Sequence, residues 1–520
     1  MKDGILIGID AGTSVMKSVA FTTGGEQLAV AAVPNHYVTL DDGGVEQDMT
    51  RTWADAVATL KQLGDKIPDL ASRLIAISVT AQGDGMWLVD KDGEPVGPAT
   101  IWLDNRAAPI VADYVARPEY AAHYQRTGTG LTVVQMTGKL AWCQQHRPAH
   151  FAKATHAFHC KDWIYFKLTG DRVTDPSEAN FTFGNYKTRR YEPDILDHLG
   201  IGQAKALLPP IVDGTREAGA LSPAAAAATG LKPGTPVCLG YIDVVCTGLG
   251  GGLYDPSGNS GCTIVGSTGM HMCLRPDAST VQLNTEKSGF TIVFPAPGMV
   301  SQMQSNLAAT LNIDWLLDVA LSVLRDSGVE RNRSDLLAGM DEKLLARQPA
   351  KLLYHPYISR AGERGPFMNM KARAMFNGLD TTADYFDMMR AVFEGLAFAA
   401  RDCYAVMGPI PSEIRLTGGA ARSKALRQIL ASVLSANVRS VSREECGAAG
   451  TAMIAAVQQK VFPDMETCAK AWVDPYLGMS IEPDGQQART YGKTFPNYVA
   501  ARQAMDPLWR KMGAIEYRNI

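Results

Sequence analysis

A group of small and charged residues near the start of the chain could bind phosphate. After a short apolar stretch, the group consists of Asp10, Gly12, Thr13, Ser14 and Lys17. A turn of small residues lets backbone N–H groups and hydroxyls approach phosphate oxygens, and a lysine adds positive charge. A carboxylate at a strand end can hold Mg²⁺, so Asp10 is a candidate metal ligand. An ordinary β-turn would explain the same residues, and the group matches neither a Walker A loop nor a dinucleotide-binding motif.

Two adjacent glycines later in the chain could bind a nucleotide. The strand-like run Ile414–Thr417 leads into Gly418 and Gly419, and Ser423 opens a helix expected over 423–435. Bare backbone at two glycines lets a flat ring lie against it, and the start of a helix attracts phosphate. A plain strand-to-helix turn is the alternative.

A carboxylate near the middle of the chain could act as a general base. Asp243 follows the apolar run Val237–Leu239 and precedes the glycine-rich stretch 248–252. A carboxylate placed there can accept the proton of a hydroxyl nucleophile. An aspartate that only caps a helix would have the same sequence pattern.

Polar residues that follow two further strand-like runs suit a small ligand with several hydroxyl groups. These residues are Gln82, Gly83 and Asp84 in one place and Trp102 in another. Amide and carboxylate groups bind hydroxyls, while an indole ring packs on C–H faces. Polar residues of a surface hairpin would give the same pattern.

The elements expected around these residues alternate between strands and helices. In the first half, strands are predicted at Gln27–Val33 and Leu74–Thr80, a helix at Met49–Ile67, and a hairpin around Lys91–Gly93. A hairpin-rich start followed by helices indicates a mixed sheet with helices packed on it.

The second half repeats this design. The run Cys262–Gly269 resembles Ile5–Ser14 in being a short apolar strand that ends in small residues, which suggests two domains of one type. The helix expected at Gly447–Gln458 is made of small residues and is predicted to pack closely. We place the domains at 1–246 and 247–520, and no motif is evident beyond about residue 465.

Composition narrows the classes of protein. The 520 residues carry a net charge of −3 with no basic block, so no nucleic-acid partner is implied. No apolar stretch approaches the roughly 18 residues of a membrane span, and the N-terminal residues are not expected to act as a signal peptide. Nine scattered cysteines without a C-x-x-C pair favour buried thiols in a reducing cytoplasm.

One long segment identifies a family. The run from Ala374 through Met375, Phe376 and Gly378 to Glu394 resembles the C-terminal signature of the FGGY carbohydrate kinases at every constrained position. Resemblance extends from Ile5 to about Ala456 and includes the segments 158–163, 175–178, 266–271, 304–315 and 362–366. The N-terminal signature is met less well, because Met136 stands where a small residue is usual.

The resemblance implies a fold, a reaction and a set of site residues. The fold would be α/β, with two ribonuclease-H-like domains around a central cleft for ATP and sugar. ATP and Mg²⁺ would be required, and Asp243 would be the catalytic base. The implied phosphate and nucleotide contacts are Asp10, which also organises Mg²⁺, and Gly12, Thr13, Ser14, Lys17, Ser267, Thr268, Gly269, Gly418, Gly419 and Ser423. The implied substrate contacts are Gln82, Gly83, Asp84, Trp102, Gln135 and His271.

The resemblance also implies a small polyol as substrate, with erythritol first and a pentitol, a ketopentose or glycerol as alternatives. Glycerol kinase, a member of the family, has Arg–Glu where this chain has Gly83–Asp84, so Gly83 is expected to leave room for a longer polyol. A homodimer is a candidate assembly. A non-catalytic ATP-binding switch of the actin type is a rival that Asp243 argues against, and a Rossmann dehydrogenase would need the missing dinucleotide motif.

Overall fold

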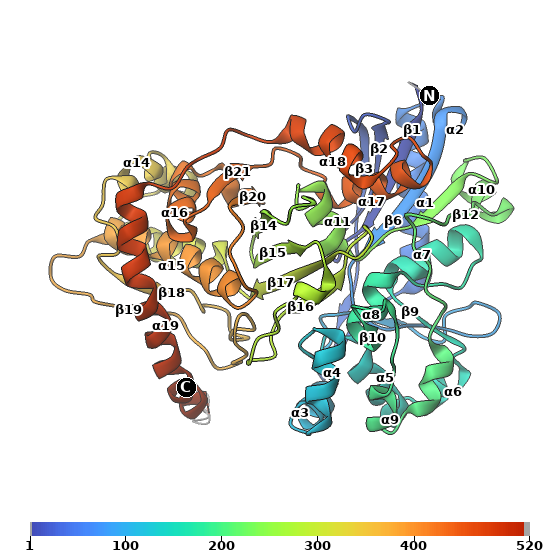
Figure 1. Ribbon diagram of the computed structural model, residues 1–520, viewed down its shortest axis with the longest axis horizontal. Coiled ribbons are helices and arrows are strands. Elements are labelled where there is room, and N and C mark those ends of the chain that lie inside the picture. The colour runs from blue at the N-terminus through green and yellow to red at the C-terminus, as the bar shows by residue number, and fades with distance from the viewer. Residues whose placement is uncertain (1–2, 514–520) are drawn as a thin grey trace.

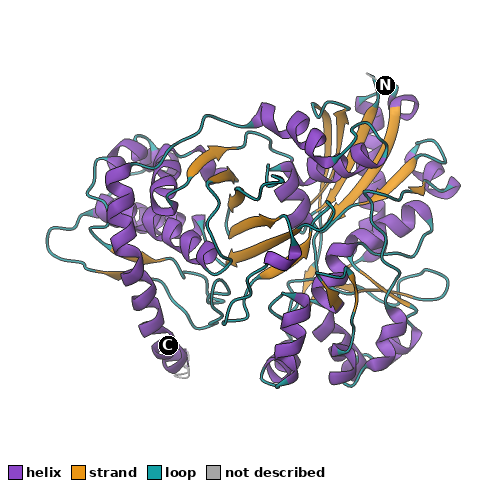
Figure 2. Cartoon of the chain, viewed as in Figure 1, coloured by secondary structure: helices purple, strands orange, loops and turns teal. Residues whose placement is uncertain are grey.

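Two six-stranded mixed sheets organise the protein. The computed structural model describes residues 3–513, and Figure 1 shows one sheet on the N-terminal side and the other in the centre of the molecule. Helices pack around both sheets (Figure 2). The prediction of an α/β protein with two mixed sheets is confirmed.

The first sheet has the strand order β12–β13–β6–β1–β2–β3. Strand β1 pairs antiparallel with β2 and parallel with β6. The five residues at the start of β1 are fully buried, as expected for a strand covered on both faces. The strands are β1 (Ile5–Ala11), β2 (Val15–Thr22), β3 (Gln27–Pro34), β6 (Leu74–Ala81), β12 (Gly219–Ala220) and β13 (Pro236–Leu239).

The second sheet repeats this topology. Its order is β16–β17–β15–β14–β20–β21, and β14 pairs antiparallel with β15 and parallel with β20. The turn after β14 therefore corresponds to the turn after β1, as the suggested duplication requires. The strands are β14 (Ser260–Val265), β15 (Gly269–Arg275), β16 (Phe290–Val293), β17 (Val300–Asn306), β20 (Glu413–Thr417) and β21 (Asn437–Ser440).

Short strands complete the β-structure. The predicted hairpin around Lys91–Gly93 forms as an antiparallel bridge between Val89 and Pro95, with the Asp90 and Val96 N–H groups donating to the Glu94 and Leu88 carbonyls. Strand β7 also pairs with β9. The short strands are β4 (Val38–Thr39), β5 (Val45–Gln47), β7 (Trp87–Val89), β8 (Ala99–Thr100), β9 (His156–Phe158), β10 (Gly184–Asn185), β11 (Arg190–Tyr191), β18 (Leu353–His355) and β19 (Met375–Asn377).

The helices begin where the sequence offers caps. The Asp48 side chain accepts the Thr50 and Arg51 backbone N–H groups at the start of α1. The helices up to residue 250 are α1 (Met49–Lys66), α2 (Leu70–Arg73), α3 (Ala108–Val115), α4 (Glu119–Thr127), α5 (Met136–His146), α6 (Pro148–Lys153), α7 (Cys160–Thr169), α8 (Pro176–Phe183), α9 (Ile195–His198), α10 (Pro223–Thr229) and α11 (Asp243–Gly250). The later helices are α12 (Thr310–Asp326), α13 (Arg333–Leu337), α14 (Met340–Leu345), α15 (Tyr385–Ala405), α16 (Lys424–Leu434), α17 (Cys446–Gln458), α18 (Met465–Val473) and α19 (Gly485–Gly513).

Helices α11 and α17 lie between the two sheets (Figure 1) and pack against each other. Their backbones touch: a Cβ atom on Gly450 would lie 1.9 Å from the Cys246 carbonyl oxygen, and one on Gly250 would lie 2.1 Å from that of Cys446. Helix α17 also contacts β1 and β6 of the first sheet, although it comes late in the chain. Its small residues thus serve close packing, as predicted.

The segment beyond residue 465 packs on the rest of the protein. Trp472 of α18 is buried against Phe21 of β2, and Tyr491 and Tyr498 of α19 are buried beside α15. Among residues 3–513, no helix combines the length and the apolar character that crossing a membrane would require.

Candidate active site

A cavity of about 670 Å³ opens where the end of β1 faces the loops of the second sheet. Both halves of the chain line it, because α17 brings its first turn against the first sheet. Its lining includes Asp10, Lys17, Thr247, Gly418, Gly419 and Gly447. The structure therefore brings together predicted phosphate and nucleotide residues that are about 400 positions apart in the sequence.

Asp10 and Lys17 are the charged residues that the first sheet contributes to this cavity. The Lys17 ammonium pairs with the Glu445 carboxylate at 2.8 Å, which links β2 to the residue before α17. Burial raises the pKa of Asp10 to about 6, with Lys17 lowering it and Glu445 raising it. A Cβ atom on Gly447 would lie 2.4 Å from an Asp10 carboxylate oxygen, so only glycine leaves that carboxylate in place.

The first predicted phosphate turn is tied directly to the predicted polyol residues. The Thr13 hydroxyl donates to the Gln82 side chain at 3.2 Å and accepts from the Trp102 indole N–H at 2.8 Å. The Gly12 carbonyl accepts from the Asn35 side chain at 2.9 Å, and Ser14 follows in the same turn. These contacts fix the turn and the indole ring relative to each other.

The second predicted phosphate turn joins β14 to β15. Ser267 and Thr268 are exposed at its tip, while Gly269 is buried at the start of β15. The Ser267 carbonyl accepts the Ala309 N–H at 2.7 Å, so the start of α12 holds this turn.

The glycine pair after β20 behaves differently at its two positions. Gly418 has φ 93°, a conformation that favours glycine, and a Cβ atom there would lie 2.5 Å from the Val265 carbonyl. Gly419 lines the cavity, and nothing lies within 4 Å of where its Cβ would be. The Ser423 hydroxyl caps α16 and donates to Asp341 at 2.6 Å, which occupies it within the protein.

Replacing Gly419 by Val should raise the KM for ATP by about tenfold or more. The isopropyl group would meet no protein atom at its Cβ and would project into the cavity that the nucleotide needs. Steady-state kinetics with varied ATP measure the effect, and the melting temperature should stay within a few degrees. An unchanged KM for ATP would show that the turn is only structural.

Asp243 is the first residue of α11, the helix whose Thr247 lines the cavity. Its carboxylate accepts the Val244 N–H at 2.7 Å. Burial, together with the neighbouring Asp10 carboxylate, raises the pKa of Asp243 to about 7, while the Val244 N–H and Lys161 oppose the shift. Asp243 and Asp10 therefore act on each other electrostatically, as a base beside a phosphate site would.

Asp84, a predicted polyol contact, has a left-handed backbone conformation and one carboxylate oxygen without a hydrogen-bond partner. Its φ is 60°, and its N–H donates to Glu178 at 3.3 Å. One buried carboxylate oxygen has no hydrogen-bond partner. Burial raises the pKa of Asp84 to about 7; Lys139 and Arg364 lower it and Asp243 raises it. Asp84 thus shares its surroundings with Asp243 and with a cation from the second half.

The expectation that Gly83 leaves room for a longer polyol is wrong. A Cβ atom on Gly83 would lie 2.1 Å from the Ile242 Cδ1 atom. The space that the absent side chain could have left is filled by Ile242, the residue before Asp243. A side chain at position 83 would require Ile242 to shift, so in this structure the absent side chain makes room for Ile242 and not for a longer polyol.

Gln135 and His271 have their polar atoms occupied by protein groups. The Gln135 side chain accepts the Thr132 N–H at 2.6 Å. The ring nitrogens of His271 lie 3.0 Å from the Asn306 side chain and 3.3 Å from the Thr263 hydroxyl. Burial lowers the pKa of His271 to about 4, so the ring is neutral near pH 7. Their roles as substrate contacts stay predictions.

Several residues that act on Asp84 or on the Ile242–Asp243 segment were not predicted from the sequence to belong to the site. They are Lys139, Lys161, Asp175, Ser177, Glu178 and Arg364. Charged residues within otherwise buried segments such as 158–166 were the available signal, since charges are rarely buried without a purpose.

Comparisons with known proteins place this chain in one family. Residues 5–250 match the model of the N-terminal domain of the FGGY family of carbohydrate kinases, and residues 261–459 match that of its C-terminal domain. The erythritol kinase of Brucella abortus (strain 2308) is 49% identical over 99% of this chain and 98% of its own length. The gluconate kinase of Lactobacillus acidophilus superposes with a TM-score of 0.88 at 23% identity, covering 98% of this chain and 99% of that one. The xylulose kinase of Rhodospirillum rubrum gives 0.86 at 26% identity, covering 97% and 100%.

Proposed function

Because this chain belongs to the FGGY family of carbohydrate kinases, we propose that it transfers the γ-phosphoryl group of ATP to a terminal hydroxyl of erythritol, forming erythritol 4-phosphate. The observation that carries the choice of substrate is the 49% identity, over nearly the full length of both chains, to an erythritol kinase. The proposed contacts are the site residues described above, with Asp243 as general base and Asp84 as a polyol contact.

The proposed reaction brings the γ-phosphate of ATP to the hydroxyl of the polyol between the two sheets. Phosphoryl transfer depends mainly on positioning and charge stabilisation. ATP would occupy the 670 Å³ cavity, with its phosphates between the turns after β1 and β14. Asp243 would accept the proton of the attacking hydroxyl as that oxygen bonds to the γ-phosphorus and the bond to ADP breaks. Trp102, held by Thr13, would offer its ring to the carbon chain.

The Asp10 carboxylate fits an Mg²⁺ ion. It lines the cavity, and burial raises its pKa to about 6, so a cation beside it would stabilise the ionised form. Mg²⁺ is usually bound by one or two carboxylates together with substrate phosphates and water. When bound, it would neutralise charge on the phosphates.

A panel of acceptors tests the proposal. ADP release would be followed with ATP–Mg²⁺ and erythritol, glycerol, D-threitol, ribitol, xylitol, D-xylulose and L-xylulose. Erythritol should have the highest kcat/KM by at least tenfold. Preference for a pentitol, a ketopentose or glycerol would keep the reaction and overturn the substrate, and ATP turnover that ignores every acceptor would favour an actin-type switch.

The dependence of kcat/KM on pH should reflect the ionisation of Asp243. The carboxylate must be ionised to accept a proton, and burial raises the pKa of Asp243 to about 7. Activity is therefore full above this pKa and lost as pH falls through it. We expect kcat/KM for erythritol to fall by about tenfold per pH unit below pH 7. A profile that stays flat down to pH 5.5 would contradict the assignment.

We also propose that the enzyme works in the cytoplasm, where ATP is abundant. All nine cysteines are free and buried, which fits a reducing compartment. A homodimer stays a prediction.

A further inference from the structure

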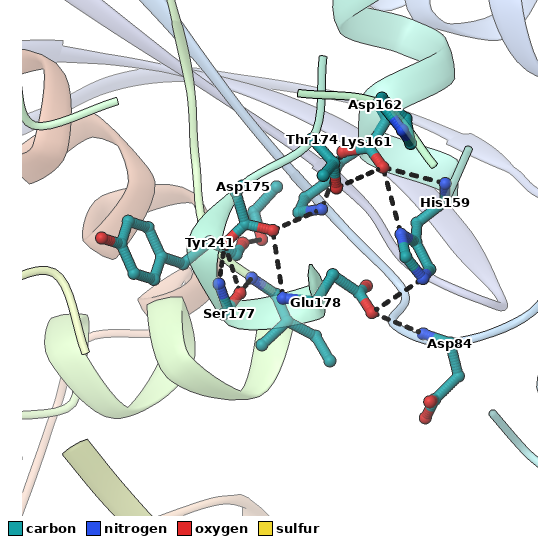
Figure 3. A network of polar contacts seen from close by, with 12 residues as sticks. Asp84, His159, Lys161, Asp162, Thr174, Asp175, Ser177, Glu178 and Tyr241 are labelled. Carbon is teal, nitrogen blue, oxygen red and sulfur yellow. Dashed lines mark hydrogen bonds and ion pairs between the residues drawn. The ribbon is translucent and has the colours of Figure 1, made fainter. Parts of the chain in front are cut away.

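A buried set of polar and charged side chains lies next to Asp84 (Figure 3). We call it the α8 network, and it consists of His159, Lys161, Asp162, Thr174, Asp175, Ser177 and Glu178. Lys161, Asp162, Asp175 and Glu178 are all 0% exposed. Charges removed from water in this way are costly unless they are paired, and apolar packing would often be as stable. The segments that this network holds therefore indicate its purpose.

The network fixes the start of α8 against α7. The Lys161 ammonium lies 2.9 Å from Asp162 and 2.7 Å from Asp175. Burial alone would raise the pKa of Asp162, but Lys161 and His159 lower it to about 2, so this carboxylate stays ionised. Asp175 in turn caps α8 by accepting the backbone N–H groups of Ser177 and Glu178.

Ser177 and Glu178, in the first turn of α8, make hydrogen bonds to the segments that carry Asp243 and Asp84. The Ser177 hydroxyl accepts the N–H of Ile242, the residue before Asp243, at 3.0 Å, and donates to Asp175. Glu178 accepts the Asp84 N–H at 3.3 Å, while the Asp84 carboxylate points away from the network (Figure 3).

Asp84 needs such a support. Its φ of 60° is a conformation that residues other than glycine adopt at a cost and keep only where their surroundings impose it. The Glu178 oxygen that accepts the Asp84 N–H also lies 3.4 Å from a ring nitrogen of His159, and the whole Glu178 side chain is buried.

We propose that Ser177 and Glu178 are positioning residues for phosphoryl transfer, Ser177 placing Asp243 and Glu178 placing Asp84. This inference rests on the proposed function, because it takes Asp243 as the base and Asp84 as a polyol contact. The Ser177 contact would affect proton transfer through Asp243, and the Glu178 contact would affect polyol binding through Asp84. Their loss should therefore separate kcat from KM, which a merely structural role would not do.

Steady-state kinetics on the best acceptor of the panel test this. Ser177→Ala should lower kcat by about tenfold or more, because small misplacement of a reacting group is costly, with KM for the polyol and for ATP within twofold. Glu178→Met should raise the KM for the polyol by about tenfold with a smaller change in kcat. Ser177→Thr restores a hydroxyl and Glu178→Gln restores an acceptor oxygen, so each should recover most of its loss.

Thr174→Val is the matched control. It removes a buried hydrogen bond to Asp162 (2.9 Å) in the same network but has no contact with Asp84 or Ile242. It should lower the melting temperature as Ser177→Ala does, with kcat and KM within twofold of wild type.

Kinetics of Ser177→Ala that match those of Thr174→Val would overturn the inference. If Ser177→Ala yields no folded protein, an unchanged polyol KM in Glu178→Met would do the same. A wild-type enzyme that phosphorylates no acceptor overturns the proposed function and the inference with it, whereas an active wild type with unaffected variants overturns the inference alone.

Discussion

Replacing Asp243 by Asn is expected to lower kcat by about 10²–10⁴, with little change in stability. The amide keeps the shape of the side chain and still offers an oxygen to the Val244 N–H, which Asp243 accepts at 2.7 Å. It cannot take a proton from the attacking hydroxyl. Coupled ADP-release assays give kcat, and calorimetry gives the melting temperature.

The control separates a base from a helix cap. Asp464 caps α18 by accepting the Thr467 N–H at 2.7 Å, and it is exposed. Asp464→Asn should leave kcat unchanged. The residual activity of Asp243→Asn should also lack the decline below pH 7 that the wild type shows. A kcat near that of wild type in Asp243→Asn would remove this residue from the mechanism.

Replacing Gly450 by Ala should destabilise the protein by about 3 kcal/mol or more. The new methyl group would lie 1.9 Å from the Cys246 carbonyl oxygen and 2.7 Å from its carbon, so α17 and α11 must move apart. Since Asp243 opens α11, kcat should fall as well. Thermal unfolding and the polyol assay measure the two effects.

Gly64→Ala is the matched control because it makes the same change inside another helix. Nothing lies within 4 Å of where a Cβ atom on Gly64 would be. Alanine loses less conformational freedom than glycine on folding, so this variant should gain about 0.5–1 kcal/mol. Equal and small effects of both substitutions would show that the approach of the two helices is not tight.

Local structure could be predicted well where a short stretch determines it. The helix start at Asp48 and the strand Leu74–Ala81 follow from a cap and from an apolar run. The expected hairpin at Lys91–Gly93 forms as predicted. What the local sequence did not indicate is that β7 also pairs with β9, about 65 residues further along. Strand pairing of that kind depends on distant residues. The domain division at 246/247 stays a prediction.

Part of the site could also be predicted. Asp10, Lys17, Gly418 and Gly419 were placed together by family resemblance and do line one cavity. The room assigned to Gly83 was wrong, since a side chain from 159 positions away, Ile242, fills it. A glycine in a sequence shows that a side chain is absent but not which neighbour occupies its place.

By itself, the sequence of this protein determined the α/β class and the carbohydrate kinase family, and it singled out Asp10, Lys17, Gly418 and Gly419, which line the cavity. Short segments of fixed residue type carry that information. Tertiary structure decided which ionisable side chains are buried away from solvent. Burial and neighbouring charge raise the pKa of Asp243 to about 7 and that of Asp10 to about 6. Tertiary structure also placed Lys161 and Glu178 behind the polyol residues. Desolvation and contacts between distant segments arise only when the chain is packed, so no local pattern could show them.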